Sequence, residues 1–203
     1  MEQQTPNASL AWRTRAWCAT AVTGVVVPVL LLLALSGSPS ELAAVSAPTF
    51  TLALMGAGII AAAIVGRFWF GILLALVNAA GVFLLAWALG MPAVAHSVSA
   101  CLAMVVASGS FAARGALFAT TLSHRGWLMA LFVVAGEGSV LLIAYVWPGV
   151  LPAWFLALLP AQWASAAIQS ALTGSGAIGA VSVLVALAGT VVATLLAARF
   201  WQR

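Results

Sequence analysis

Glu137 is the residue of this sequence best placed to do chemistry, because it interrupts the otherwise apolar stretch FVVAGEGSVLL, residues 132–142. Trp127 and Trp147 lie ten residues to either side of it. Tryptophan favours the membrane interface, so Glu137 is expected about 15 Å along a helix from each interface, near the midplane of the bilayer. An ionisable side chain at that depth predicts a functional role, here as part of a path for a proton, a cation or a polar substrate.

Two further polar residues are candidates to line this path. Asn78 lies nine residues from Trp69 and nine from Trp87, so it too is expected near the midplane, where its carboxamide could donate to Glu137. His96 is expected nearer the outer end of its span. In a second interpretation, Glu137 is a neutral acid bonded to Asn78 or to a backbone carbonyl and only clamps two helices together. Both interpretations stay open at this point.

The parts of a hydrolytic or metal-dependent active site are scarce. The two histidines, His96 and His124, stand far apart, and the sequence has neither paired acids nor a cluster of metal ligands. The stretch TGSGAIG is similar to the serine loop of rhomboid intramembrane proteases, but Thr173 replaces a required glycine and both histidines precede Ser175. We therefore assign no catalytic residue, no metal ligand and no cofactor. These observations favour a protein that is not an enzyme over an enzyme, and leave the question open.

The composition requires a membrane environment. Only 5% of the residues are charged and 65% are hydrophobic, with a mean hydropathy of +1.20, whereas soluble domains carry about 25% charged residues. Continuous apolar blocks predict helices, since a barrel would show short segments of alternating polarity. The net charge of +4 comes from dispersed arginines, which indicates a role in topology and no nucleic-acid partner. We expect an all-α polytopic membrane protein with one integral membrane domain, 1–203.

Apolar runs and their breaks predict the individual segments. The expected transmembrane helices are 17–36, 49–66, 69–89, 93–110, 127–147 and 177–198. Residues 1–16 are expected to form a cytoplasmic tail. The segment 110–126 carries Arg114, His124 and Arg125 between apolar residues, which predicts an amphipathic element on the cytoplasmic surface and a docking place for a cytoplasmic partner.

Residues 148–176 are apolar enough to enter the bilayer but contain several helix breakers. Their prolines are Pro148, Pro152 and Pro160. Proline together with tryptophan at this density suits an interfacial or re-entrant element better than a straight crossing. Gln162 and Gln169 are expected to line the inner wall of this outer-face element.

The arginines choose between two topologies. If residues 148–172 crossed the membrane, the chain would have seven transmembrane helices, and Arg199 and Arg203 would face away from Arg13 and Arg15, against the positive-inside rule. If they enter and return, six helices cross and every arginine faces the cytoplasm. We expect six transmembrane helices plus a broken or re-entrant outer-face element in the inner (plasma) membrane, with both termini cytoplasmic. Seven helices remain the alternative.

Small residues at a spacing of four predict helix contact faces, because lipid does not drive helices together as water does. The two sets are Gly58, Ala62 and Gly66 in the second span and Gly189, Ala193 and Ala197 in the last.

The last quarter of the chain resembles the permease subunits of type-2 ABC exporters. The similarity consists of LLPAQWASAAIQSALTG, a following apolar helix and the basic ending ARFWQR. It implies a transport role with a cytoplasmic ATPase, for which 110–126 would be the docking place. The sequence departs from that family between the second and third spans, where only GRFW stands in place of a charged cytoplasmic helix.

Three functions follow from these observations. The leading one is a transport component or permease-like subunit with a polar intramembrane path. The second is a membrane scaffold or assembly factor in which Glu137 only clamps helices, and the third and weakest is a lipid-modifying enzyme. Homo- and hetero-oligomers are both compatible with the sequence.

Overall fold

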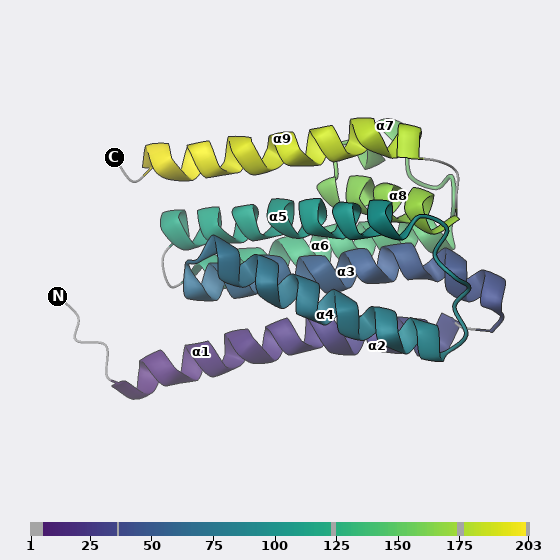
Figure 1. Ribbon diagram of the computed structural model, residues 1–203. Helices are drawn as coiled ribbons and strands as arrows, with labels where there is room; N and C mark the ends of the chain where they lie inside the picture. Colours follow the sequence, from purple (N-terminus) through teal and green to yellow (C-terminus); the bar gives the residue numbers. More distant parts are fainter. Residues whose placement is uncertain (1–5, 36, 123–124, 174–176, 202–203) are drawn as a thin grey trace.

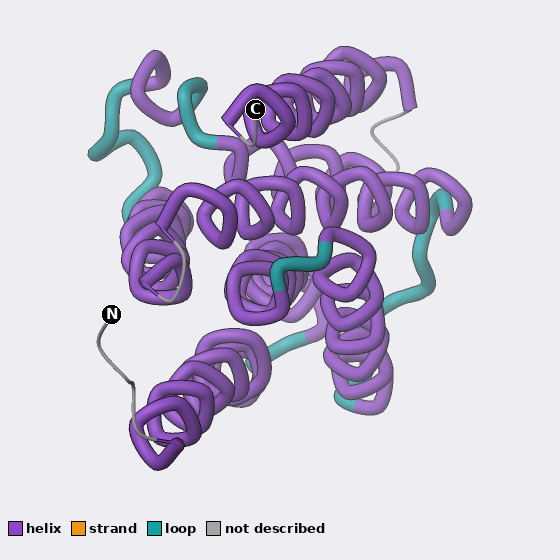
Figure 2. Tube along the Cα trace, turned by 90° about the vertical axis from the view of Figure 1, so that its left-hand side faces the viewer, coloured by secondary structure: helices purple, strands orange, loops and turns teal. Residues whose placement is uncertain are grey.

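The protein is an all-α, multi-pass membrane protein, as the sequence predicts. The computed structural model describes residues 6–35, 37–122, 125–173 and 177–201, and this part of the chain consists of helices joined by loops and turns (Figure 2). Five of its helices are long and apolar enough to cross a membrane, and the last helix adds a shorter apolar stretch, Leu184–Ala197.

The first crossing is one continuous helical run. It consists of α1 (Pro6–Ala21), a π-helical turn η1 (Val22–Val26) and α2 (Val27–Leu35). Pro28 has no N–H and cannot donate to the carbonyl oxygen of Gly24 four residues earlier, and the π-helical turn lies at this point. The predicted tail 1–16 is helical from Pro6 onward, because proline fits the first turn of a helix and no breaker follows it there.

Helix α3 (Pro39–Val65) is the centre of the bundle. It packs against the first crossing, α4, α5, α6 and α8, and in Figure 1 it lies between α1–α2 on one side and α5 on the other. Three of its hydroxyl side chains are fully buried and donate to carbonyl oxygens of their own helix, as the pairs Ser46–Leu42, Thr49–Val45 and Thr51–Ala47 show. Each of these three hydroxyl groups therefore has a hydrogen-bond partner within α3, so α3 can be buried at the centre of the bundle without leaving them unsatisfied.

Helices α4 (Phe68–Ala88), α5 (Ser97–Leu122) and α6 (Gly126–Val146) follow as alternating crossings (Figure 1). Gly66 ends α3 with φ +70°, a left-handed conformation that glycine adopts without strain, and Arg67 is the residue before α4.

The prediction that 110–126 lies on the membrane surface is wrong for residues 110–122. Residues 110–122 are the last turns of α5, which continues well beyond the expected end at 110, and Ser110 and Phe111 are fully buried. No proline interrupts the helix here, and small residues let it press closely against α3. A Cβ atom on Gly115 would overlap the carbonyl group of Ile59, whose carbon would lie only 2.9 Å away, so this stretch belongs to the interior of the bundle.

One of the two predicted small-residue faces is a helix contact. A Cβ atom on Gly58 would lie 3.3 Å from Phe111 Cβ, and a Cβ atom on Gly115 would lie 2.8 Å from the Cβ of Ala62. The face expected in the last helix makes no such contact. A Cβ atom added to Gly189 would meet no heavy atom within 4 Å, and Ala193 is exposed.

Residues 148–173 form the predicted broken element. It contains the short α7 (Ala153–Leu156) and then α8 (Pro160–Thr173), and α9 (Ala177–Trp201) follows. The 14 residues of α8 measure about 21 Å, less than the ~30 Å of a hydrocarbon core. Helix α6 ends and α9 begins at the same end of the bundle (Figure 1), so the element between them enters the bundle and returns.

Basic residues gather at the opposite end of the bundle. Helix α1 begins and α9 ends there, beside the α3–α4 turn and the start of α6 (Figure 1). The arginines placed at this end are Arg13, Arg15, Arg67, Arg125 and Arg199. Arg114 is the exception, because it lies inside the bundle on α5.

Candidate functional site

Arg114 and Glu137 form an ion pair inside the bundle. Arg114 Nη1 lies 2.5 Å from Glu137 Oε1, and the two side chains are only 14% and 13% exposed. Arg114 lies about 12 Å along α5 from Leu122, and Glu137 about 16 Å along α6 from Gly126. The Glu137 carboxylate thus lies near the middle of α6, far from both ends of the helix, and its partner is the Arg114 cation of the neighbouring helix α5.

Local sequence explains how the pair is positioned. Gly138 faces α3 so closely that a Cβ atom on it would lie 2.9 Å from Leu52 Cδ2, and this contact turns the preceding residue, Glu137, toward α5. On α5 the guanidinium carbon of Arg114 lies 5.0 Å from the ring centroid of Phe111, one turn earlier. The buried ring supports the cation from one side and adds a cation–π attraction.

The pair leaves polar atoms unsatisfied. Arg114 Nε and Nη2 and Glu137 Oε2 are buried and have no hydrogen-bond partner among the described residues. Buried polar atoms in native proteins are bonded to protein, water or ligand. The two charges compensate each other, and the remaining two donor nitrogens and one acceptor oxygen are available to water or to a polar molecule that reaches them.

Asn78 is not the partner of Glu137, contrary to the prediction. Its Nδ2 donates to the carbonyl oxygen of Gly24 and, at 3.1 Å, to that of Ala53. The first of these bonds supplies a donor where Pro28 cannot provide one. Asn78 therefore fastens α4 to the first crossing and to α3.

His96 does not join the ion pair. His96 is exposed just before α5, about 27 Å along the helix from Arg114, and its backbone N–H donates to the carbonyl oxygen of Ala171 at 3.1 Å. His124 lies outside the described residues. Arg125 is exposed just before α6. Of the two described residues expected on the cytoplasmic surface, Arg114 therefore lies in the interior instead.

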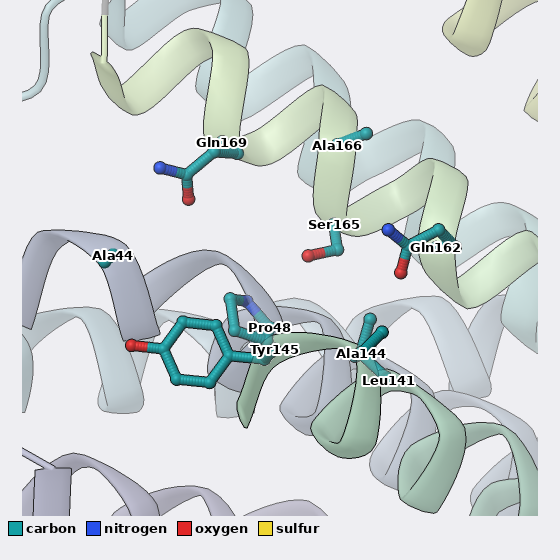
Figure 3. A pocket seen from close by; sticks show the side chains of 9 residues that line it. All are labelled: Ala44, Pro48, Leu141, Ala144, Tyr145, Gln162, Ser165, Ala166 and Gln169. Carbon is teal, nitrogen blue, oxygen red and sulfur yellow. The ribbon is translucent and has the colours of Figure 1, made fainter. Parts of the chain in front are cut away.

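A cavity of about 340 Å³, here called the outer pocket, lies between α3, α6 and α8, at the end of the bundle opposite the arginines (Figure 3). Its lining residues are Ala44, Pro48, Leu141, Ala144, Tyr145, Gln162, Ser165, Ala166 and Gln169. The sequence predicts Gln162 and Gln169 on an inner wall, and both do line this pocket. Sequence reasoning missed Ser165 and Tyr145, although the spacing of residues 162, 165 and 169 places them on one helical face and could have indicated the serine.

The outer pocket and the ion pair share one face of α6. Glu137, Leu141 and Tyr145 stand at intervals of four residues, which places their side chains one above another. Tyr145 and Leu141 line the pocket, and Glu137 lies one turn deeper. Leu141 is 4% exposed and stands one helical turn from Glu137 on this face, so an apolar side chain of the pocket lining is the neighbour of the paired carboxylate along α6.

Comparison with known proteins adds no assignment to this geometry. No family model, curated protein or solved structure matches the chain. Among the described residues, no three His, Cys, Asp or Glu side chains are grouped so that they could hold a metal ion.

Proposed function

We propose that the protein is a transport component of the inner membrane, permease-like, that moves a small polar solute along one face of α6. The observation that carries the proposal is the column of Tyr145, Leu141 and Glu137 on α6, whose first two members line the outer pocket and whose third belongs to the ion pair. Leu141 is the closing side chain of this column. A solute in the pocket reaches the charged pair when Leu141 moves aside.

The ion pair suits the inner end of such a path. A lone carboxylate at this depth would be costly in lipid, and the adjacent guanidinium compensates its charge. The unpaired Arg114 Nε and Nη2 and Glu137 Oε2 offer donors and an acceptor to a solute that arrives from the pocket. Binding there would replace water without requiring that the two charges separate.

The orientation proposed for the protein follows the distribution of arginine. The end of the bundle that carries Arg13, Arg67 and Arg199 faces the cytoplasm under the positive-inside rule, which also places both termini there. The outer pocket then opens toward the external side. Solutes would enter the path from outside or leave it there.

Solute entry into proteoliposomes tests the proposal. Stopped-flow light scattering would follow the swelling of vesicles challenged with glycerol, glucose, glycine or sodium chloride, with protein-free vesicles as the baseline. We expect faster entry of at least one solute with the wild-type protein and a return to baseline with Leu141→Trp, which blocks the column. Leu128→Trp is the matched control, because Leu128 lies on the same helix and is 49% exposed. Baseline rates for every solute, or an unaffected Leu141→Trp variant, would contradict the proposal.

A scaffold or assembly factor is the second candidate, and the ion pair itself favours it, since a contact between Arg114 and Glu137 joins α5 to α6. Glu137→Gln separates the two functions. The amide retains a hydrogen-bonding acceptor for Arg114 but removes the charge. If the variant elutes and melts like the wild type but no longer transports, the result supports the transport function. If transport is unchanged, the result supports a scaffold in which Glu137 only holds two helices together.

A further inference from the structure

Ser165 differs from the other buried polar residues of the structure. The buried polar set of the described chain is Thr20, Ser46, Thr49, Thr51, Ser108, Ser110 and Ser165. The first six all use their hydroxyl groups in hydrogen bonds within the protein. Ser165 is 8% exposed and bonds to no described residue. Its hydroxyl group points into the outer pocket (Figure 3).

The other polar side chains that line the pocket with Ser165 also have no hydrogen-bond partner among the described residues. The carboxamides of Gln162 and Gln169 and the hydroxyl of Tyr145 make no hydrogen bond to any residue that the structure describes, and both carboxamides extend from α8 toward the cavity (Figure 3). Pro48 cannot donate to the carbonyl oxygen of Ala44, and both residues line the same space. Donors and acceptors therefore converge on the pocket from three helices.

The lining of the outer pocket contains no charged side chain, and this indicates an uncharged ligand. An anion would call for arginine or lysine, and a divalent cation would call for carboxylates, but none of these residues lines the pocket. A single dehydrated ion is also much smaller than the cavity. At about 30 Å³ per water, the 340 Å³ correspond to roughly eleven water molecules, which is the volume of a compact molecule with about a dozen non-hydrogen atoms.

We infer that the outer pocket binds an uncharged, polyhydroxylated molecule of about the size of a hexose. Each glutamine offers both a donor and an acceptor, as Ser165 does, and a hydroxyl group needs both kinds of partner. Tyr145 and Pro48 lie across the cavity from α8 (Figure 3) and present apolar surface to the C–H groups of the same ligand. This inference rests on the proposed function, for which it names the substrate class.

The same chemistry occurs in two sources, a free sugar in water and the sugar headgroup of a lipid in the outer leaflet. Both would place neutral hydroxyl groups against Gln162, Ser165 and Gln169. The experiment therefore has one arm for each source.

Equilibrium binding to the full chain in phosphatidylcholine nanodiscs tests the inference. The free probes are radiolabelled glucose, galactose, mannose and myo-inositol, and glucosamine and glucuronate serve as charged counterparts. The lipid arm adds monoglucosyl diacylglycerol to the nanodisc. We expect at least one neutral probe, or the glycolipid, to bind saturably, and each charged counterpart to bind about tenfold more weakly than its neutral parent.

Variants then locate the site. Gln162→Leu, Gln169→Leu and Ser165→Ala should each weaken binding about fivefold, the effect of one lost hydrogen bond. Ser170→Ala is the matched control, because Ser170 lies on the same helix outside the pocket and donates to the carbonyl oxygen of Ala167, 2.9 Å away. Elution volume and melting temperature verify that each variant is folded.

The outcomes separate this inference from the proposed function. Failure of every neutral probe and of the glycolipid to bind, tighter binding of a charged counterpart, or equal losses in Ser165→Ala and Ser170→Ala would overturn the inference. Saturable binding without any solute entry into proteoliposomes would overturn the proposed function alone. Solute entry that is blocked by Leu141→Trp, with no polyol binding, would overturn the inference alone.

Discussion

Arg114 Nη1 lies 2.5 Å from Glu137 Oε1, and this ion pair links α5 to α6 in the interior of the bundle. Lipid supplies little driving force for helix association, so polar contacts and close packing determine which helices meet. The ion pair explains how a carboxylate is tolerated in an apolar stretch. It also explains why one arginine lies apart from the other described arginines, which gather at one end of the bundle.

The first prediction concerns the energetic coupling of this pair. Arg114→Leu and Glu137→Leu should each lower the free energy of unfolding by about 3 kcal/mol, because each leaves a buried charge without its partner. The double variant should recover most of that loss, since it removes both charges. Chemical unfolding in detergent measures the three variants as a double-mutant cycle. Losses that simply add would show that the two side chains act independently.

The second prediction concerns Asn78 and Pro28. Asn78→Leu removes the donors to the carbonyl oxygens of Gly24 and Ala53 and should cost about 1–2 kcal/mol of unfolding free energy. Pro28→Ala restores a backbone N–H that can donate to Gly24 within the helix. The cost of Asn78→Leu should therefore be smaller in the Pro28→Ala background, as measured by the same unfolding assay. An equal cost in both backgrounds would mean that the Asn78–Gly24 bond contributes nothing.

The sequence predicts the architecture well because a helix that crosses the bilayer must consist almost entirely of apolar residues. Apolar runs identify the crossing helices, and the prolines of 148–176 identify the broken element, since neither depends on which helices are neighbours. The residues at the ends of helices are less well predicted. In the sequence, an arginine with a buried partner looks the same as an arginine on the surface. Arg114 therefore indicates a surface position, and the end of α5 is expected at 110, before it.

Side-chain partners could not be predicted for a related reason. Depth along a helix follows from counting residues, and it places both Glu137 and Asn78 near the midplane. Which face of α6 meets which helix depends on close contacts such as Gly138 against Leu52. These contacts are tertiary, so sequence spacing selects Asn78 as the partner of Glu137 where the fold supplies Arg114.

The third prediction tests the close approach of α5 and α3. Gly115→Ala would place a Cβ atom against the carbonyl group of Ile59, so the helices must separate, at a cost of about 2 kcal/mol of unfolding free energy. Gly189→Ala is the matched control on α9, where a new Cβ meets no heavy atom within 4 Å. It should leave stability unchanged or raise it slightly, because alanine favours the helix. Thermal unfolding in detergent would distinguish the two, and similar melting temperatures would contradict the packing described for Gly115.

The fourth prediction tests whether the broken element returns to the side from which it enters. Cys18 and Cys101 are exposed and would first be replaced by serine. Single cysteines are then introduced at Val150 and Thr173, which are both exposed. Val150 precedes α7, and Thr173 is the last residue of α8, so the two positions lie at the two ends of the broken element.

A membrane-impermeant maleimide applied to intact cells should label cysteines at Val150 and Thr173 alike, because α6 ends and α9 begins at the same end of the bundle (Figure 1). A cysteine at Leu122, which is 42% exposed at the end of α5, should react only after the membrane is permeabilised. If the element crossed instead, the reagent would reach only one of the first two positions from outside. Because the outer pocket lies between this element and α6, labelling of both positions from one side would also place the mouth of the pocket on that side.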